Sequence, residues 1–130
     1  MRKERVLLVD GNQPTLQAVR SLLAPDFEIV GAVNDGHAAL AAFAQLRPDV
    51  VVLDISMPVL NGIGAARFLR ETDPTAKIVF LTVNHAADLR EAALETGALG
   101  YVTKVRMGID LVQAIRLALD GRQFVSPGSG

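Results

Sequence analysis

The chain has 130 residues, of which 50% are hydrophobic and 21% charged, as expected for one globular domain rather than a disordered segment. The formal net charge is -1, which excludes a large basic surface for nucleic acid. There is no cysteine, which excludes disulfides, thiol catalysis and cysteine metal sites. The first apolar run is too short for a signal peptide or a membrane span, so we expect a cytoplasmic, non-membrane protein.

Short apolar runs alternate along the chain with segments whose apolar residues recur at helical spacing. The expected strands are residues 5–10, 27–33, 50–54, 77–82 and 100–103, and the expected helices are residues 14–23, 37–46, 62–71, 86–96 and 109–119. The last helix is expected to present Ile109, Val112, Ile115 and Leu119 on one face. Five strands alternating with five helices predict an α/β domain, with a single parallel sheet covered by helices on both faces.

The run from Val50 to Leu53 has no polar alternation, which favours a strand buried on both faces. It stops at Asp54, and Pro58 and Asn61-Gly62 then predict turns before the next helix. We therefore expect Asp54 at the carboxyl end of a central strand, where open α/β sheets place ligand sites. The alternative is that Asp54 only caps the following turn or helix.

Four residues with chemically active side chains stand at equivalent positions. Asp10, Asp54 and Thr82 each end a strand, and Lys104 directly follows another. Each alone has an ordinary explanation, as a cap, a strand residue or a solvated lysine. Because the carboxyl ends of parallel strands share one edge of the sheet, however, we expect the four to converge.

Their chemistry is compatible with phosphoryl transfer. Two nearby carboxylates suit a hard cation such as Mg²⁺, and a carboxylate is a nucleophile that forms an acyl phosphate. The Lys104 ammonium would stabilise the transferred group, and the Thr82 hydroxyl would donate a hydrogen bond to it once it is present.

Three motifs give the chain a family resemblance. Leu53-Asp-Ile-Ser-Met-Pro-Val-Leu-Asn-Gly62, Phe80-Leu-Thr-Val-Asn-His85 and Gly100-Tyr-Val-Thr-Lys104 resemble the phosphorylation-site, switch and lysine motifs of receiver domains in bacterial two-component response regulators. The resemblance covers residues 5–125 and is closest to the nitrate-response, LuxR-type branch. It implies a flavodoxin-like fold with strand order 2-1-3-4-5.

The resemblance also implies a role for each site residue. Asp54 would be the phosphoacceptor, and Asp10, Asp54 and the Ser56 backbone carbonyl the metal ligands. Lys104 would pair with the phosphoryl group, and Thr82 and Tyr101 would form a coupled switch pair. Ser56 and Asn84 stand where the family tunes the lifetime of the acyl phosphate, and Val83 stands where a branched side chain would narrow access. The alternative for Tyr101 is a half-buried aromatic residue with a solvated hydroxyl.

Two positions depart from the family: Val83, where many receivers have alanine or glycine, and the position directly after the first acid of the site. A second acidic residue usually follows the first, and here that position is Gly11. One metal-binding carboxylate is therefore missing, and we expect weaker Mg²⁺ binding, with water in the vacant position.

The resemblance implies a signalling domain, spanning residues 1–125, that accepts a phosphoryl group from a sensor histidine kinase. It would switch a partner or homodimer surface and catalyse only its own phosphoryl transfer, so that it is not a turnover enzyme. In the nitrate-response branch a helix-turn-helix DNA-binding domain follows. Residues 126–130 would then be a flexible tail or the start of the linker, in a truncated rather than a stand-alone protein.

The sequence leaves two alternatives. In the first, Gly11 marks an atypical receiver that acts by dimerisation or partner binding without phosphorylation. In the second, the chain is a haloacid-dehalogenase-type phosphatase. That family needs an acid two residues after its nucleophile, and Ser56 stands there.

Overall fold

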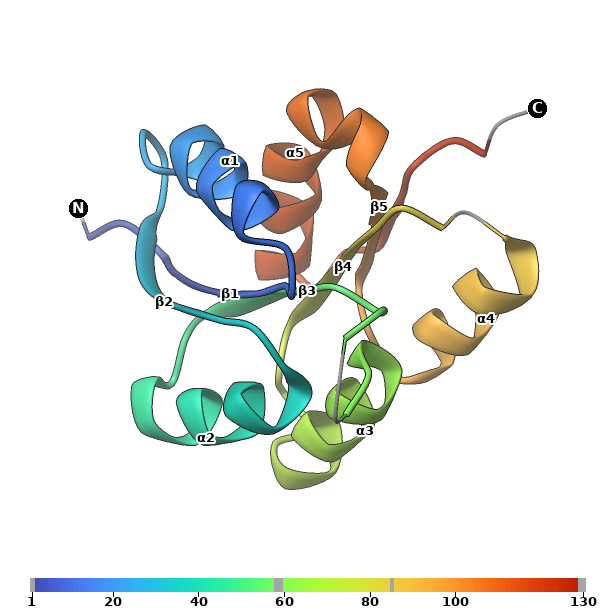
Figure 1. The fold of residues 1–130 in the computed structure, drawn as a ribbon, viewed down its shortest axis with the longest axis horizontal. Coiled ribbons are helices and arrows are strands. Elements are labelled where there is room, and N and C mark those ends of the chain that lie inside the picture. Colours follow the sequence, from blue (N-terminus) through green and yellow to red (C-terminus); the bar gives the residue numbers. More distant parts are fainter. Residues whose placement is uncertain (1, 58–59, 85, 129–130) are drawn as a thin grey trace.

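A parallel sheet lies between two layers of helices in the computed structural model, which describes residues 2–57, 60–84 and 86–128 (Figure 1). The expected turn at Pro58 and the residue His85 lie outside this description. No helix among the described residues is long and apolar enough to cross a membrane.

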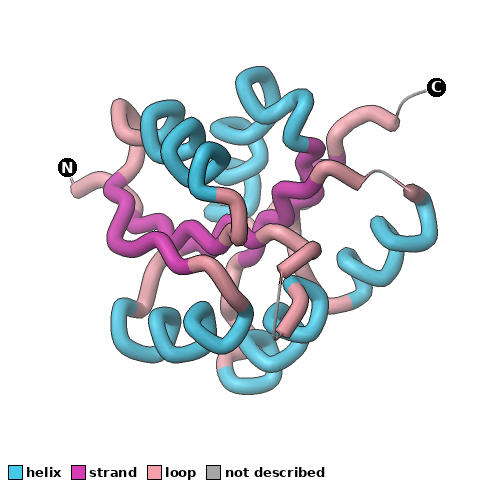
Figure 2. Tube along the Cα trace, in the orientation of Figure 1, coloured by secondary structure: helices cyan, strands magenta, loops and turns pink. Residues whose placement is uncertain are grey.

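The helices and strands alternate along the chain as predicted, with bounds that differ by one or two residues (Figure 2). The strands are β1 Arg5–Val9, β2 Glu28–Val33, β3 Val50–Leu53, β4 Ile78–Thr82, β5 Gly100–Thr103 and β6 Phe124–Val125. The helices are α1 Gln13–Leu23, α2 Gly36–Leu46, α3 Gly62–Thr72, α4 Ala87–Glu95 and α5 Met107–Leu119, and a 3₁₀ turn, η1 Lys104–Arg106, precedes α5.

The sheet has six strands in the order β2-β1-β3-β4-β5-β6, so the expectation of five strands was wrong. The order of the first five is confirmed. The sixth strand has two residues and pairs in parallel with the edge of β5, with Tyr101 opposite Val125. So short a strand leaves no alternation in the sequence, because it exists only through its ladder with a distant strand.

Successive residues of the central strands supply two separate cores, as the two-residue repeat of a strand requires. Val6, Leu8 and Val52 pack with α1 and α5 on one face of the sheet. Leu7, Val51 and Phe80 pack with α2, α3 and α4 on the other face (Figure 1). The strands nearest the centre, β3 and β4, are buried at every residue, which explains their continuous apolar sequence.

Side-chain caps start three of the helices. Asn12, Asp35 and Asn61 each accept a hydrogen bond from the backbone N–H three residues later, at the beginning of α1, α2 and α3.

The prediction of which α5 residues face the core was partly wrong. Ile109 is 71% exposed, whereas Asp110 is buried. The inward face of α5 is made by Asp110, Leu111, Ala114, Ile115 and Ala118. Asp110 can turn inward because partners from two other segments satisfy its carboxylate, which the spacing of apolar residues does not reveal.

Candidate functional site

Two carboxylates stand next to each other where β1 and β3 end. These strands pair in parallel with Val9 opposite Leu53, so Asp10 and Asp54 leave the same edge of the sheet. The backbone N–H of Asp54 donates to the carbonyl of Val9 at 2.9 Å, which extends the ladder by one residue. Asp10 is 4% exposed and Asp54 is 6% exposed, so both are largely removed from water.

Lys104 reaches both carboxylates from the end of β5. Its Nζ lies 2.8 Å from Asp10 Oδ2 and 3.4 Å from Asp54 Oδ2. The side chain of Lys104 is 16% exposed, so the ammonium is also largely removed from water. Three of the four residues expected to converge are therefore in contact, whereas the Thr82 side chain makes no hydrogen bond to them among the described residues. The shorter distance to Asp10 shows that Lys104 is held by both acids and does not serve Asp54 alone.

The electrostatics favour a further positive charge at this edge. Burial, and then the nearby charge of Asp10, raises the pKa of Asp54, while Lys104 and the N–H of Ile55 act in the opposite direction. The Ile55 N–H donates to Asp54 Oδ1 at 2.8 Å. Two carboxylates face one ammonium, which leaves one negative charge for an added cation to neutralise.

The donor set fits Mg²⁺ in part. Asp10 Oδ1 accepts a hydrogen bond from the N–H of Asn12, but Asp10 Oδ2 is buried and accepts none from any described residue. Its ion pair with Lys104 does not have hydrogen-bond geometry. Asp10 and Asp54, with a backbone carbonyl such as that of Ser56, would supply oxygen ligands, and water would complete the shell. Within the described ranges, no cluster of three or more His, Asp or Glu side chains suited to a metal occurs.

The predicted switch residues form a second, linked group. Thr82 is completely buried at the end of β4, opposite Thr103 of β5. Its Oγ1 accepts a hydrogen bond from the N–H of Asn84 at 3.2 Å, and the hydroxyl of Tyr101 donates to the Asn84 carbonyl at 2.6 Å. Asn84 therefore connects Thr82 to Tyr101, a contact that the sequence does not show.

Tyr101 is 1% exposed, and the alternative of a half-buried ring with a solvated hydroxyl is wrong. The ring fills space in the core shared with α2, α3 and α4. Burial raises the pKa of Tyr101, against the opposing influence of the Arg90 charge. The hydroxyl is thus a neutral donor held inside the protein.

Three predicted residues lie on exposed positions around the site. Gly11 follows Asp10, Ser56 lies two residues after Asp54, and Val83 directly follows Thr82 with 72% of its surface exposed. Their family roles stay predictions, because none of the hydrogen bonds among the described residues joins them to the two carboxylates.

Sequence reasoning missed a polar network beside Lys104. Asp110 accepts hydrogen bonds from Arg106 Nε at 2.8 Å and from Ser126 Oγ at 2.8 Å. A lone acid in the first turn of α5 was the only available signal, since acids are favoured there by the helix dipole. The pairing with Ser126, sixteen residues away, has no local pattern.

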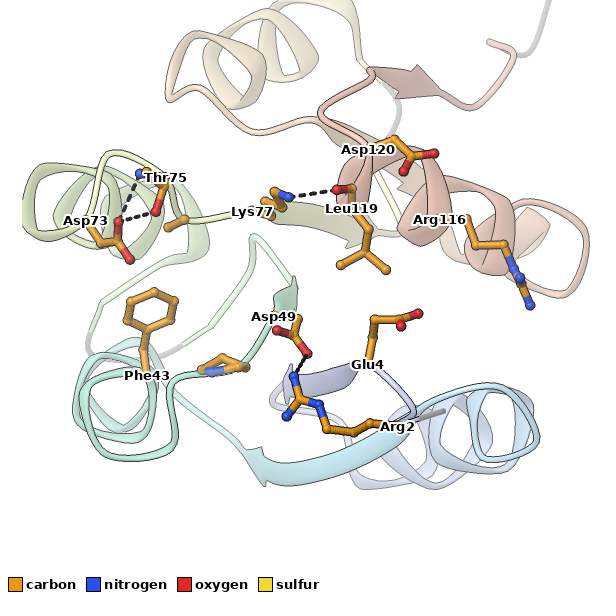
Figure 3. Close-up of a pocket in the computed structure, with 12 residues that line it drawn as sticks. Arg2, Glu4, Phe43, Asp49, Asp73, Thr75, Lys77, Arg116, Leu119 and Asp120 are labelled. Atoms are coloured by element: carbon orange, nitrogen blue, oxygen red, sulfur yellow. Dashed lines mark hydrogen bonds and ion pairs between the residues drawn. The ribbon is translucent and has the colours of Figure 1, made fainter.

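A pocket of about 730 Å³ lies at the opposite edge of the sheet (Figure 3). Its lining includes Glu4, Asp49 and Lys77, which precede β1, β3 and β4. Three of its charged side chains have partners within the protein: Arg2 pairs with Asp49, and Lys77 donates to the carbonyl of Leu119. The pocket holds none of the convergent residues and is not part of the candidate site.

Comparison with known proteins places this geometry in a family. The family model described as "Response regulator receiver domain" matches residues 6–116. The chain is 35% identical over 125 residues to the response regulator GacA of Pseudomonas viridiflava, which covers 95% of this chain and 58% of GacA. The chain thus spans little more than half the length of that relative.

Solved structures agree on the fold. A two-component response regulator of the LuxR family from Aurantimonas sp. SI85-9A1 superposes with a TM-score of 0.91 at 35% identity, covering 96% of this chain and 91% of that one. The signal receiver domain of NarL from Mycobacterium tuberculosis gives a TM-score of 0.89 at 27% identity, covering 94% of this chain and 100% of that one. The expected similarity to the nitrate-response, LuxR-type branch is confirmed.

Proposed function

Because the chain belongs to the response regulator receiver domain family, of the LuxR and NarL type, we propose that it accepts a phosphoryl group on Asp54 and converts that modification into a change of surface. The donor would be a phosphohistidine of a sensor histidine kinase. The observation that carries the proposal is the triad of Asp10, Asp54 and Lys104, with one ammonium 2.8 Å and 3.4 Å from the two carboxylates.

The proposed step is a transfer between two nucleophiles. An Asp54 carboxylate oxygen attacks phosphorus, a P–O bond forms, and the P–N bond to the donor histidine breaks. The electron pair of that bond stays on the imidazole. Lys104 stabilises the charge on the phosphoryl oxygens, as cationic groups do in other phosphoryl transfers. The site consumes its own carboxylate and releases no product until hydrolysis, so the domain is not a turnover enzyme.

Mg²⁺ is the cofactor that the donor set favours, held by Asp10, Asp54 and the carbonyl of Ser56, and it would supply additional positive charge to the phosphoryl oxygens. The absence of a carboxylate at Gly11 makes this binding weaker than in receivers with both acids. Asp10 then has two tasks, because the same carboxylate also holds Lys104.

The response is proposed to begin at Thr82. Its hydroxyl donates to the phosphoryl group, and the loop that contains Asn84 moves with it. Since Asn84 also accepts the hydrogen bond from Tyr101, the movement reaches β5. The changed surface would bind a partner or a second copy of the domain. In a longer protein of the LuxR type it would regulate transcription through a helix-turn-helix domain, and the basic surface for DNA would belong to that domain.

Intact mass spectrometry tests the proposal directly. The chain is incubated with acetyl phosphate and Mg²⁺, beside Asp54→Ala and, as a matched control, Asp26→Ala, which removes an exposed acid remote from the site. The parent and Asp26→Ala should gain one phosphoryl group, and Asp54→Ala should gain none.

No gain in the folded parent at high Mg²⁺ would contradict the proposal, as would a gain that persists in Asp54→Ala. Repeating the experiment with Gly11→Asp then separates two causes. Recovered phosphorylation would identify Gly11 as the defect, and continued absence would favour an interaction module that works without phosphorylation.

A further inference from the structure

The last described segment of the chain is held against the strand that leads to Lys104. After α5 the chain turns and runs parallel to β5 as β6. The N–H of Phe124 donates to the carbonyl of Leu99 at 2.9 Å, and the N–H of Ser126 donates to the carbonyl of Tyr101 at 2.8 Å. Because these are backbone hydrogen bonds, a shift of β5 would displace the segment as well.

Ser126 adds two side-chain contacts to this ladder. Its Oγ donates to Asp110 Oδ2 at 2.8 Å and accepts from the N–H of Thr103 at 3.3 Å. Ser126 is 4% exposed, although the sequence assigns it to a tail. One small residue thus bonds to Tyr101 of the switch pair, to the residue that precedes Lys104, and to α5.

Asp110, which accepts the hydrogen bond from Ser126, also contacts the turn η1 that contains Lys104. Arg106, the last residue of η1, donates to Asp110 through Nε at 2.8 Å and through Nη2 at 3.3 Å. Lys104 is the first residue of η1. The turn is therefore fixed at one end by the carboxylates of the candidate site and at the other by Asp110 and Ser126.

We propose that Ser126, with Asp110 and Arg106, forms a latch that couples the charge state of Asp54 to the attachment of the carboxyl-terminal segment 124–128. The inference rests on the proposed function, because it concerns how phosphorylation of that site is transmitted. In this arrangement a movement of Lys104 and β5 acts directly on residues 124–128, and no change at the exposed surface of the domain is needed first.

The direction of the effect follows from the distances. Lys104 now lies nearer to Asp10 than to Asp54. A phosphoryl group on Asp54 adds negative charge and draws the ammonium, and with it Thr103 and η1, toward Asp54. The bond from the Thr103 N–H to Ser126 Oγ is the longer of the two that the Ser126 side chain makes, and its donor moves with Lys104, so it is the first to break. Phosphorylation should loosen residues 124–128.

Linkage makes the coupling reciprocal: if phosphorylation loosens the latch, loosening the latch must favour the phosphorylated state. The Ser126→Ala variant removes both side-chain bonds and should bind beryllofluoride, an inert phosphoryl analogue, more tightly in the presence of Mg²⁺. Ser21→Ala is the matched control, because Ser21 is an exposed serine on α1.

The experiment combines intact mass, amide hydrogen exchange and beryllofluoride titration on the whole 130-residue chain. We expect hydrogen exchange of the amides in residues 124–128 to become at least about threefold faster when Asp54 is phosphorylated. We also expect an affinity for beryllofluoride at least about threefold higher in Ser126→Ala than in the parent and Ser21→Ala. Exchange in the unsubstituted chain decides the question even if Ser126→Ala fails to fold.

The failures are distinguishable. If the parent gains one phosphoryl group but exchange of 124–128 is unchanged or slower, the latch is overturned and the proposed function stands. If Ser126→Ala folds and binds beryllofluoride as the parent does, the latch is likewise overturned. If the parent gains no phosphoryl group, the proposed function fails and the latch fails with it.

Discussion

Lys104 and the two acids beside it set the charge of the candidate site. With Gly11 in place of an acid, a single ammonium is shared by two buried carboxylates, and Asp10 Oδ2 accepts no hydrogen bond from the described residues. The ammonium thus offsets one of the two negative charges, and one negative charge remains for a metal to neutralise. A metal must compete with Lys104 for Asp10, which is a physical reason to expect weak binding.

We predict that Gly11→Asp raises the affinity for Mg²⁺ at least about tenfold, or about 1.4 kcal/mol, because it adds a charged oxygen ligand beside Asp10. The backbone tolerates the change, since positive φ angles among the described residues occur only at Arg47, Gly97 and Gly121. Isothermal titration calorimetry measures the affinity. Gly11→Asn, which adds a side chain without charge, is the control, and equal affinities for the two variants would contradict the prediction.

Asp110 gives a prediction about pH. The hydrogen bonds from Arg106, and then that from Ser126, hold the pKa of Asp110 below its ordinary value against the effect of burial. A carboxyl whose folded pKa is lowered stabilises the protein fully above its unfolded pKa, about 3.9. That contribution is lost as the pH falls through the lower folded pKa.

We predict that Asp110→Asn lowers the free energy of unfolding by about 1.5–3 kcal/mol at neutral pH, because it removes a hydrogen-bonded charge. The difference from the parent should shrink as the pH is lowered below about 4, where the parent carboxyl also becomes neutral. Urea unfolding at a series of pH values measures both. Asp88→Asn, at an exposed acid in the first turn of α4, should change little at any pH. A constant deficit for Asp110→Asn would refute this reading of the network.

Helix α3 begins where the backbone passes close to Asp54. A Cβ added at Gly62 would lie 1.9 Å from the carbonyl oxygen of Asp54, so only glycine fits at the first residue of this helix. The Gly62 N–H also donates to the carbonyl of Ile55 at 2.8 Å. The start of α3 and the loop after β3 are thus locked together by one residue.

We predict that Gly62→Ala lowers the free energy of unfolding by about 1–3 kcal/mol, because backbone must move to admit the methyl group. Gly108→Ala is the matched control in α5, where an added Cβ meets nothing within 4 Å. It should raise stability by about 0.5 kcal/mol or more, since alanine restricts the unfolded chain. Urea unfolding compares the two, and changes of the same sign would show that the contact with Asp54 is not the deciding one.

The buried faces of helices and strands were predictable where they consist of apolar residues only. The continuous apolar sequences of β3 and β4 correctly indicated burial on both faces. The inner face of α5 was misjudged at Ile109, because Asp110 faces inward only with the help of Arg106 and Ser126. Helical spacing orders residues around an axis, but it does not say which polar ones find partners.

The whole molecule places its charges so that neither sign dominates. There are 13 Lys and Arg against 14 Asp and Glu, and the net charge is -1. The two acids and one lysine of the candidate site leave one net negative charge at one edge of the sheet, and the pocket at the other edge contains both signs. A chain with this net charge does not suit a polyanion.

We therefore predict that this chain does not bind duplex DNA at physiological salt, because it releases too few counterions from the phosphates. Fluorescence anisotropy with a labelled duplex measures it, in the phosphorylated and unmodified chain. Binding with a dissociation constant of about 10⁻⁶ M or tighter would contradict the prediction, since nonspecific binding by basic proteins reaches only that range.

The sequence by itself determined the alternation of strands and helices and the residues at the strand ends. These depend on local periodicity and on the rule that parallel strands share one carboxyl edge, so Asp10, Asp54 and Lys104 could be brought together in advance. The tertiary structure alone decided how Lys104 divides its charge, that Asn84 joins Thr82 to Tyr101, and that Ser126 closes a sixth strand onto β5. Each of these is a contact between distant segments, whose geometry is set by packing of the whole chain and leaves no pattern in either segment.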